Sequence, residues 1–547
     1  MATSKVTFLI VKPENGAIWD LVRLLIVGDK KCYAKFLECS GVDDYVVEED
    51  DCNGSVGGEV DDLRWVIFVS ILVRKILKVF EKPLEWTGYF LEFLLNLFSL
   101  NGSFLGLLYN ILHGKLVIPQ RGTETFISSI GHIDGRINLY KTESLTKEFT
   151  QPDFIDKNLQ LGMGHRALMD LYMMSSKLAY ENENVVKNVV NHHWKMHFVD
   201  FYNCWNDYQK ESSTQVFILC DKPKDANLIL ISFRGTEPFD ADDWITDFEY
   251  SWYEIPNLGK VHMGFLEALG LGNRENVTTF HELFVKNAKS TNSENVDVTI
   301  AHPQQQPPER STAYHTVRRK LKSLLTEHEN ARFVVTGHSL GGALAILFPT
   351  MLVIHEETDV MKRLSGVHTY GQPRIGNRQL GKFMEAHLEH PVPKYFRVVY
   401  NNDLVPRLPY DDKTFLYKHF GVCMYYNCLY VEQNVHEEPN RNFFGLRFVL
   451  PVYLNAAWEF IRSFTMGYIY GSEYKESWES VLFRLVGLFL PGISAHSPVN
   501  YVNSDSERSP RVLCIFSKVV GADISGMAAS ATKGALKRSR FSGRGPL

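Results

Sequence analysis

The sequence lacks the features that define several classes of protein. Its eight cysteines include no CxxC pair and no spacing typical of metal ligands, so we expect reduced thiols in a protein that faces the cytosol. The net charge is −5, which gives no electrostatic reason to expect nucleic acid as a partner. The apolar run at residues 6–11 is short and ends at Lys12 and Pro13, so we do not expect a secretory signal. No motif implies a metal or an organic cofactor.

Apolar residues, in contrast, are abundant. Hydrophobic residues make up 45% of the 547 residues and aromatic residues 13%, which is enough for a large core and high for a purely soluble enzyme. The length predicts more than one structural unit. We expect an irregular segment at 1–60, a hydrophobic membrane-associating region at 61–120, a linker at 121–161, an α/β domain at 162–504 and a disordered tail at 505–547.

The hydrophobic region begins with an amphipathic pattern. Residues 65–80 are apolar except for one serine and three cations, Arg74, Lys75 and Lys78, which lie at helical spacing on one face. This pattern predicts a basic amphipathic helix at a membrane surface. Pro83 is expected to interrupt this helix.

Residues 93–112 form a second apolar segment, which is 20 residues long and contains no charge. This length can span a bilayer, but the asparagines and glycines within it make it polar for a spanning helix and favour a bend. Two interpretations of 61–120 are open. We favour a monotopic insertion that enters one leaflet and returns. The alternative is a helical subdomain whose apolar faces pack on the following domain.

Strands alternate with helices from residue 162 onward. Buried strands are predicted at 227–233, 333–336, 367–370 and 395–400, and an amphipathic helix at 312–327. This alternation predicts an α/β fold with a mostly parallel central sheet that helices cover on both faces.

The most informative motif is Gly337-His338-Ser339-Leu340-Gly341, which lies between the strand at 333–336 and a helix start rich in small residues. A nucleophilic serine requires a sharp turn between strand and helix, because this turn exposes its hydroxyl at the sheet edge. The flanking glycines relieve the crowded backbone. Ser339 is therefore the predicted nucleophile of an enzyme that forms a covalent intermediate.

A serine nucleophile needs a base and an acid that orients the base, and in α/β-hydrolases the acid precedes the histidine in the sequence. Several acidic residues after Ser339 are candidates: Asp359, Asp403, Asp411 and Asp412. Asp403 is preferred because it closely follows the strand at 395–400. The carboxyl end of that strand lies at the same sheet edge as the serine.

Three histidines after Asp403 could act as the base. His436 lies beside acidic residues and is expected to be solvated, whereas His419 fits either a core or a loop position. His496 is preferred because it lies in a loop directly after an apolar helix, from which its ring can reach the sheet edge.

The oxyanion of the tetrahedral intermediate needs two donors. The backbone N–H of Leu340, directly after the nucleophile, is the first. Thr236 is the candidate for the second, because the strand at 227–233 runs through Gly235 into this residue at the same edge of the sheet. The alternative is an ordinary turn stabilised by the threonine hydroxyl, which this segment on its own would favour.

Five motifs carry a resemblance to class 3 (fungal-type) lipases, in the order seen in that family. They are Phe233-Arg234-Gly235-Thr236, Val261-His262-Met263-Gly264-Phe265, Gly337-His338-Ser339-Leu340-Gly341-Gly342, Thr369-Tyr370-Gly371-Gln372-Pro373-Arg374-Ile375-Gly376-Asn377 and Asn402-Asp403-Leu404-Val405-Pro406. The resemblance covers about 165–503. It implies an α/β-hydrolase fold, the triad Ser339, Asp403 and His496, and an oxyanion hole from Thr236 and Leu340.

With its apolar N-terminal region, the whole chain resembles plant oil-body lipases. This resemblance implies hydrolysis of stored triacylglycerol and related acylglycerols at the lipid-droplet surface, facing the cytosol, with the endoplasmic reticulum membrane as the alternative location. A phospholipase A1 or galactolipase is the alternative activity, and an inactive lipase-like scaffold is the alternative of another class. Two parts depart from the fungal enzymes, namely an aromatic-rich insertion at 430–490 and the tail.

The segment 237–247 is predicted to be a lid over the active site. It directly follows Thr236 and combines aspartates with the apolar residues Phe239, Trp244 and Ile245. A lid needs both, because its apolar side chains are buried when it is closed in water and contact lipid when it is open. Fungal-type lipases carry a tryptophan in the corresponding lid. The alternative is a surface helix whose Trp244 is fixed in the core.

Overall fold

The structure is a computed structural model that describes residues 7–27, 35–39, 64–139, 163–256, 258–285, 311–410, 416–469 and 471–505. The predicted tail lies outside the described residues apart from its first position, as does the second half of the predicted linker.

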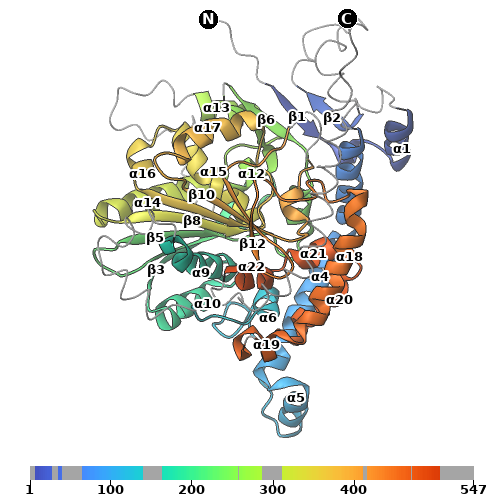
Figure 1. Cartoon of the computed structure of the whole chain (residues 1–547), viewed down its shortest axis with the longest axis vertical. Coiled ribbons are helices and arrows are strands. Elements are labelled where there is room, and N and C mark those ends of the chain that lie inside the picture. The colour runs from blue at the N-terminus through green and yellow to red at the C-terminus, as the bar shows by residue number, and fades with distance from the viewer. Residues whose placement is uncertain are drawn as a thin grey trace, which may run out of the picture.

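The centre of the molecule is an eight-stranded sheet in the order β12-β11-β10-β9-β8-β5-β4-β3 (Figure 1). Its strands are β3 (His197–Asn206), β4 (Glu211–Cys220), β5 (Leu228–Phe233), β8 (Arg332–His338), β9 (Leu364–Tyr370), β10 (Tyr395–Tyr400), β11 (Val422–Tyr426) and β12 (Glu432–Asn434). The middle strands β5, β8, β9, β10 and β11 run parallel, whereas β3, β4 and β12 pair antiparallel at the two edges. The fold is therefore an α/β-hydrolase with a mixed sheet, parallel where the sequence predicted it.

Helices cover both faces of this sheet because the side chains of each strand alternate between the faces. In β5, Ile229 and Ile231 belong to the core with α12, α14 and α15, whereas Leu228 and Leu230 belong to the core with α9 and α22. The helices of the first face are α12 (Met263–Ala268), α13 (Thr278–Val285), α14 (Ala313–Glu327), α15 (Leu340–Ile354), α16 (Thr358–Lys362) and α17 (Arg378–Leu388). Those of the second are α9 (Met163–Leu178), α10 (Glu183–Asn188), η3 (Val189–His193) and α22 (Pro498–Asp505).

A second, four-stranded sheet has the order β2-β1-β6-β7 and joins the N-terminal segment to the large domain. It consists of β1 (Phe8–Val11), β2 (Leu37–Cys39), β6 (Trp252–Ile255) and β7 (Gly259–His262), and the turn η1 (Pro13–Asn15) and helix α1 (Ile18–Val27) follow β1. The prediction of irregular structure at 1–60 is wrong for the described parts of this segment. Sequence patterns missed these short strands because β1 finds its partner β6 about 240 positions later.

The hydrophobic region forms two helices, α4 (Arg64–Leu100) and α5 (Ser103–Leu112). Pro83 lies inside α4, so the predicted break at this proline is wrong. The chain bends instead by 76° between α4 and α5, at Gly102, whose φ is 73°. Among the described residues no single helix is long and apolar enough to cross a membrane, although this bent pair would qualify by length and composition.

The first half of α4 packs on the protein. Val66, Ile67 and Ile71 are buried with side chains of the N-terminal segment and with Tyr250 and Tyr417. The start of α4, up to Ile71, thus forms the packed helix of our alternative interpretation, whereas from Ile76 onward α4 and then α5 expose large apolar side chains.

The three cations predicted to form the basic face of 65–80 contact protein groups. Arg74 Nη1 donates to the carbonyl oxygen of Val11 at 3.0 Å, and Lys75 Nζ donates to the carbonyl oxygen of Gly16 at 2.7 Å. Lys78 forms an ion pair with Glu81 at 2.7 Å. The prediction of a basic face directed at a membrane is therefore wrong for Arg74 and Lys75, which face the protein, whereas the side chain of Lys78 is 63% exposed.

The insertion at 430–490 consists mainly of helices that lie beside α4 in Figure 1. They are α18 (Val449–Ser463), α19 (Met466–Ile469) and α20 (Trp478–Gly487), followed by α21 (Pro491–Ala495). The remaining elements are the helices α6 (Ser129–Ile133) and α11 (Ala241–Asp247) and the turns η6 (Val405–Arg407), η7 (Leu446–Phe448) and η8 (Ser472–Tyr474).

Candidate active site

Ser339 lies in the turn between β8 and α15. Its φ of 58° and ψ of −133° are unusual for a residue with a side chain, and such a conformation persists only where neighbouring contacts hold it. Its N–H donates to the carbonyl oxygen of Tyr370 on β9 at 2.9 Å. A Cβ on Gly337 would overlap the backbone of Gly341, so the turn closes only with glycine at this position. The strand, turn and helix predicted from the sequence are all present.

His496 and Asp403 lie together at the same edge of the sheet. His496 Nδ1 is 2.7 Å from Asp403 Oδ2, and the hydroxyl of Tyr501 donates to the same carboxylate oxygen. The N–H of Val405 donates to the other oxygen at 2.9 Å. Asp403 is fully buried, so these contacts fix the carboxylate and leave it one orientation in which to hold the imidazole.

Ser339 Oγ and His496 Nε2 are both buried, and neither has a hydrogen-bond partner among the residues that the structure describes. These are the two atoms between which a serine hydrolase transfers its proton. In unliganded enzymes this contact is commonly long and tightens when substrate binds.

His338 contacts the histidine loop through its ring and through a hydrogen bond. Its ring stacks on that of His496 with 4.5 Å between the ring centroids. Its Nδ1 is 2.9 Å from the hydroxyl of Tyr180, and its Nε2 is 3.0 Å from the backbone oxygen of His496. Burial lowers the pKa of His338 well below its usual value, so the ring is neutral and its two nitrogens take one donor and one acceptor role.

Sequence reasoning missed three residues of this site, His338, Tyr180 and Tyr501. His338 could have been found as a member of the elbow motif itself. Tyr501 lies five positions after His496, on the next helix, and nothing in the sequence marks Tyr180.

Thr236 lies at the edge of the sheet directly after β5. Its hydroxyl donates to Asp247 Oδ2 at 2.9 Å, and both residues are buried. Burial raises the pKa of Asp247 to about 7, and the hydrogen bond from Thr236 opposes this shift. A Cβ on Gly235 would overlap the Tyr180 hydroxyl and the carbonyl oxygen of His338, so the loop approaches the elbow as closely as a backbone can.

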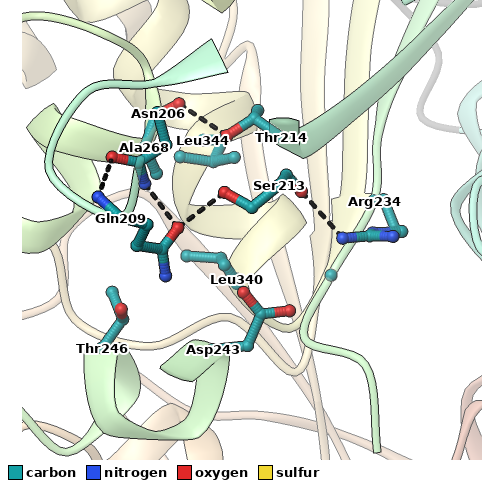
Figure 2. Close-up of a pocket in the computed structure, with 11 residues that line it drawn as sticks. Asn206, Gln209, Ser213, Thr214, Arg234, Asp243, Thr246, Ala268, Leu340 and Leu344 are labelled. Carbon is teal, nitrogen blue, oxygen red and sulfur yellow. Dashed lines mark hydrogen bonds between the residues drawn. The ribbon is translucent and has the colours of Figure 1, made fainter. Parts of the chain in front are cut away.

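A small cavity of about 10 Å³ lies beside this loop and is lined in part by Arg234 and Gly235 (Figure 2). Leu340 and Leu344 of α15 form one side of it. On its other side, Arg234 Nη2 donates to the carbonyl oxygen of Ser213 at 2.7 Å. The volume is about what one water molecule needs, so the cavity is too small for a substrate.

The alternative residues lie elsewhere. His419 Nε2 is 2.7 Å from the carbonyl oxygen of Pro406, and the ring is buried beside Glu438. His436 is exposed, and Asp359 is exposed with an ion pair to Lys362. Asp411 and Asp412 lie outside the described residues.

An apolar cavity of about 360 Å³ lies over Ser339 and His496. Its lining includes Leu91 and Leu95 of α4, Ile130 of α6, several residues of 236–244, and Leu482 and Val486 of α20, together with Tyr180 and the histidine loop. It is large enough for an acyl chain, and its floor holds both unpartnered atoms of the site.

The predicted lid segment contains α11, which begins at Ala241 and is capped by the side chain of Asp240. Phe239 and Trp244 line the apolar cavity, and Trp244 is half-buried with its Nε1 donating to the carbonyl oxygen of Pro238 at 3.2 Å. Ile245 is also half-buried. Helix α4 packs over this segment, and a Cβ on Gly88 would come within 2.6 Å of Phe239.

The sequence matches known proteins along almost its whole length. The model of the family "Lipase (class 3)" matches residues 230–413. A protein from Nicotiana tabacum named triacylglycerol lipase OBL1 is 68% identical, and the alignment covers 92% of this chain and 94% of that protein. Proteins of the same name from Arabidopsis thaliana and Ricinus communis are 56% and 46% identical, with 91% of this chain and 94% of each relative covered. The chain therefore belongs to the class 3 lipase family and is a serine ester hydrolase.

Proposed function

We propose that the protein is a triacylglycerol lipase in which Ser339, His496 and Asp403 form the catalytic triad. The observation that carries the proposal is the 2.7 Å contact between His496 and Asp403 beside the unpartnered Ser339 hydroxyl, on the floor of an apolar cavity. The names of the plant relatives support triacylglycerol as the substrate.

Acylation begins when one acyl chain lies in the apolar cavity with its ester carbon above Ser339. His496 Nε2 takes the proton of Ser339 as its oxygen attacks the carbonyl carbon, and Asp403 stabilises the imidazolium through Nδ1. His496 then gives this proton to the leaving alcohol oxygen, so diacylglycerol departs and the acyl group stays on Ser339.

The negative oxygen of the tetrahedral intermediate is held by the backbone N–H groups of Thr236 and Leu340. The bond from the Thr236 side chain to Asp247 fixes the first of these donors before substrate arrives, so little reorganisation is needed during reaction. Deacylation repeats the steps with water as the nucleophile, and His496 serves as base and then acid.

The activity is tested with purified full-length protein on triolein, phosphatidylcholine and galactolipid. We expect triolein to be hydrolysed fastest and a fluorophosphonate to label Ser339. Faster hydrolysis of phosphatidylcholine or galactolipid would favour the phospholipase A1 or galactolipase alternative. Failure to label Ser339 would contradict the proposed triad.

The proposed location is the cytosolic surface of lipid droplets, with the endoplasmic reticulum membrane as the alternative. Its support is the apolar surface of the second half of α4 and of α5, where Leu105 and Leu112 are 75% and 76% exposed. This surface is large for a water-exposed protein.

Changing Leu105 and Leu112 to glutamate should weaken attachment to lipid droplets. Both side chains project from α5, and charging them removes apolar transfer energy, so we expect binding to droplets to fall at least about tenfold. Flotation of the full chain with isolated droplets measures this effect. The matched control is Ser323→Glu with Thr326→Glu, which adds the same charge to exposed positions of α14. Equal binding of both variants would contradict attachment through α5.

The segment 237–247 is proposed as a lid whose Phe239, Trp244 and Ile245 contact lipid when it opens. Rates on a short-chain triglyceride should then rise steeply as the ester passes its solubility limit. Trp244→Ala should reduce this rise by about threefold or more while slowing hydrolysis of the dissolved ester less. A smooth rate curve for the unaltered protein through the solubility limit would contradict the lid.

A further inference from the structure

The helices α18 and α20 of the insertion bury charged side chains and expose apolar ones. The charged side chains Glu459 and Arg462 of α18 and Arg484 of α20 are buried, and Glu479 of α20 is half-buried. The outward faces of the two helices carry large apolar side chains, which in α18 include Leu454 and Ile461 at 60% and 57% exposure. No charged residue of α18 is exposed.

The buried face of α18 is satisfied by polar partners of the α/β domain. Glu459 Oε1 accepts from the hydroxyl of Tyr400 at 2.9 Å and from Asn401 Nδ2 at 2.8 Å. Arg462 Nη2 donates to the hydroxyl of Tyr430 at 2.8 Å. Buried charges require such partners, so these bonds fix which side of α18 faces the protein.

Helix α20 is held in the same way and reaches the histidine loop. Arg484 binds Glu476 through two hydrogen bonds of 2.6 and 2.7 Å, and its Nη2 donates to Asn500 Oδ1 at 3.1 Å. Asn500 in turn donates to the carbonyl oxygens of Ser494 and Ala495, just before His496. Helix α20 is therefore linked through Asn500 to the loop that carries His496, whereas α18 is held on the end of β10 and on Tyr430.

The outward apolar face continues into the catalytic cavity. Leu482 and Val486 of α20 are exposed and also line the cavity that contains Ser339, and Leu91 and Leu95 of α4 line it as well. In Figure 1, α18 and α20 run beside α4 on one side of the molecule. The cavity thus opens on an apolar surface that α4 and the insertion share.

We propose that the outward face of α18 and α20 is a second lipid-docking surface, which binds the phospholipid monolayer on a neutral-lipid droplet and places the cavity mouth against it. Exposed apolar side chains gathered on one face are unfavourable in water. A lipid layer is the occupant that fits best, because a second copy of the chain seated there would cover the mouth at Leu482 and Val486. The inference rests on the proposed function in one respect, namely that the substrate is a water-insoluble lipid.

The test uses full-length protein and triolein droplets coated with phosphatidylcholine. Leu454→Glu with Ile461→Glu lies on the outward face of α18 and outside the cavity lining. We expect this variant to float with the droplets at least about tenfold less than the unaltered protein and to hydrolyse a dissolved short-chain ester within about twofold of its rate. Ser323→Glu with Thr326→Glu should change neither quantity. Unchanged flotation of the α18 variant would overturn the proposal.

Two further measurements test the proposal. The first is photo-cross-linking of the unaltered protein, which needs no variant, and the second is light scattering, which needs no lipid. The unaltered protein is irradiated on droplets that contain phosphatidylcholine with a diazirine in its acyl chain, and cross-links are expected in 449–464 and 478–490. Cross-links in α4 and α5 alone would overturn the proposal. So would light scattering that shows a dimer for the unaltered protein and a monomer for the α18 variant. Binding to droplets does not require ester hydrolysis. If the unaltered protein bound droplets but hydrolysed no ester, that result would contradict the proposed function and not the docking surface.

Discussion

Ser339→Ala should lower kcat for a dissolved ester by a factor on the order of 10⁵ to 10⁶, because members of a catalytic triad act as one unit. His496→Ala should lower it almost equally. Asp403→Asn should leave about ten to a hundred times more activity, since the ring of His496 keeps its stacking on His338 when the acid is changed. Initial rates on p-nitrophenyl butyrate, with circular dichroism to confirm folding, measure these effects.

Variants of the other two histidines test whether His496 is the base. His436→Ala changes an exposed side chain far from the elbow and should leave the rate unchanged. His419→Ala should lower stability rather than chemistry, because this ring is buried beside Glu438 and Pro406. Near-normal rates for His496→Ala together with loss of activity for a folded His419→Ala protein would show that the wrong histidine was chosen.

Gly235→Ala should reduce kcat by a factor on the order of 10² to 10³ while the protein stays folded. The new methyl group would overlap the Tyr180 hydroxyl and the His338 carbonyl oxygen, so the loop must move and carry the N–H of Thr236 away from the oxyanion. The readout is kcat on a dissolved ester compared with the melting temperature of the variant.

Gly135→Ala is the matched control, because its Cβ would meet only the carbonyl oxygen of Gly131 at 3.7 Å, which is an ordinary contact. Adding Tyr180→Phe to Gly235→Ala should restore little, since the overlap with the His338 carbonyl remains. A Gly235→Ala protein with a normal rate would argue against Thr236 as an oxyanion donor.

The residues predicted from sequence are those whose chemistry is written in a short local pattern. The Ser339 elbow needs only a strand, a turn and a helix in succession, and the place of Asp403 shortly after β10 follows from the parallel sheet. The bond of Tyr180 to His338 and that of Tyr501 to Asp403 join residues 158 and 98 positions apart, so no local pattern predicts either contact, although Tyr501 itself lies close to His496 in the chain.

The hydrophobic region shows the opposite case. The spacing of Arg74, Lys75 and Lys78 predicted a helix correctly and its environment wrongly, because periodicity defines a face but not what covers it. Glu249 and the carbonyl groups that accept from these cations come from other parts of the chain. The sequence did not predict which face of α18 is buried for the same reason, since Glu459 and Arg462 are residue types usually found at the surface.

The small sheet that joins the N-terminal segment to the lipase domain sets an order of events during synthesis. The N–H of Val11 on β1 donates to the hydroxyl of Ser251 at 3.0 Å, across 240 positions of the chain. At translation rates of about 5 to 20 residues per second, Ser251 is synthesised roughly 10 to 50 s after Val11. During that time α4 and α5 have left the ribosome with their apolar sides uncovered. We therefore expect the nascent chain to need a chaperone or a lipid surface before the catalytic domain exists.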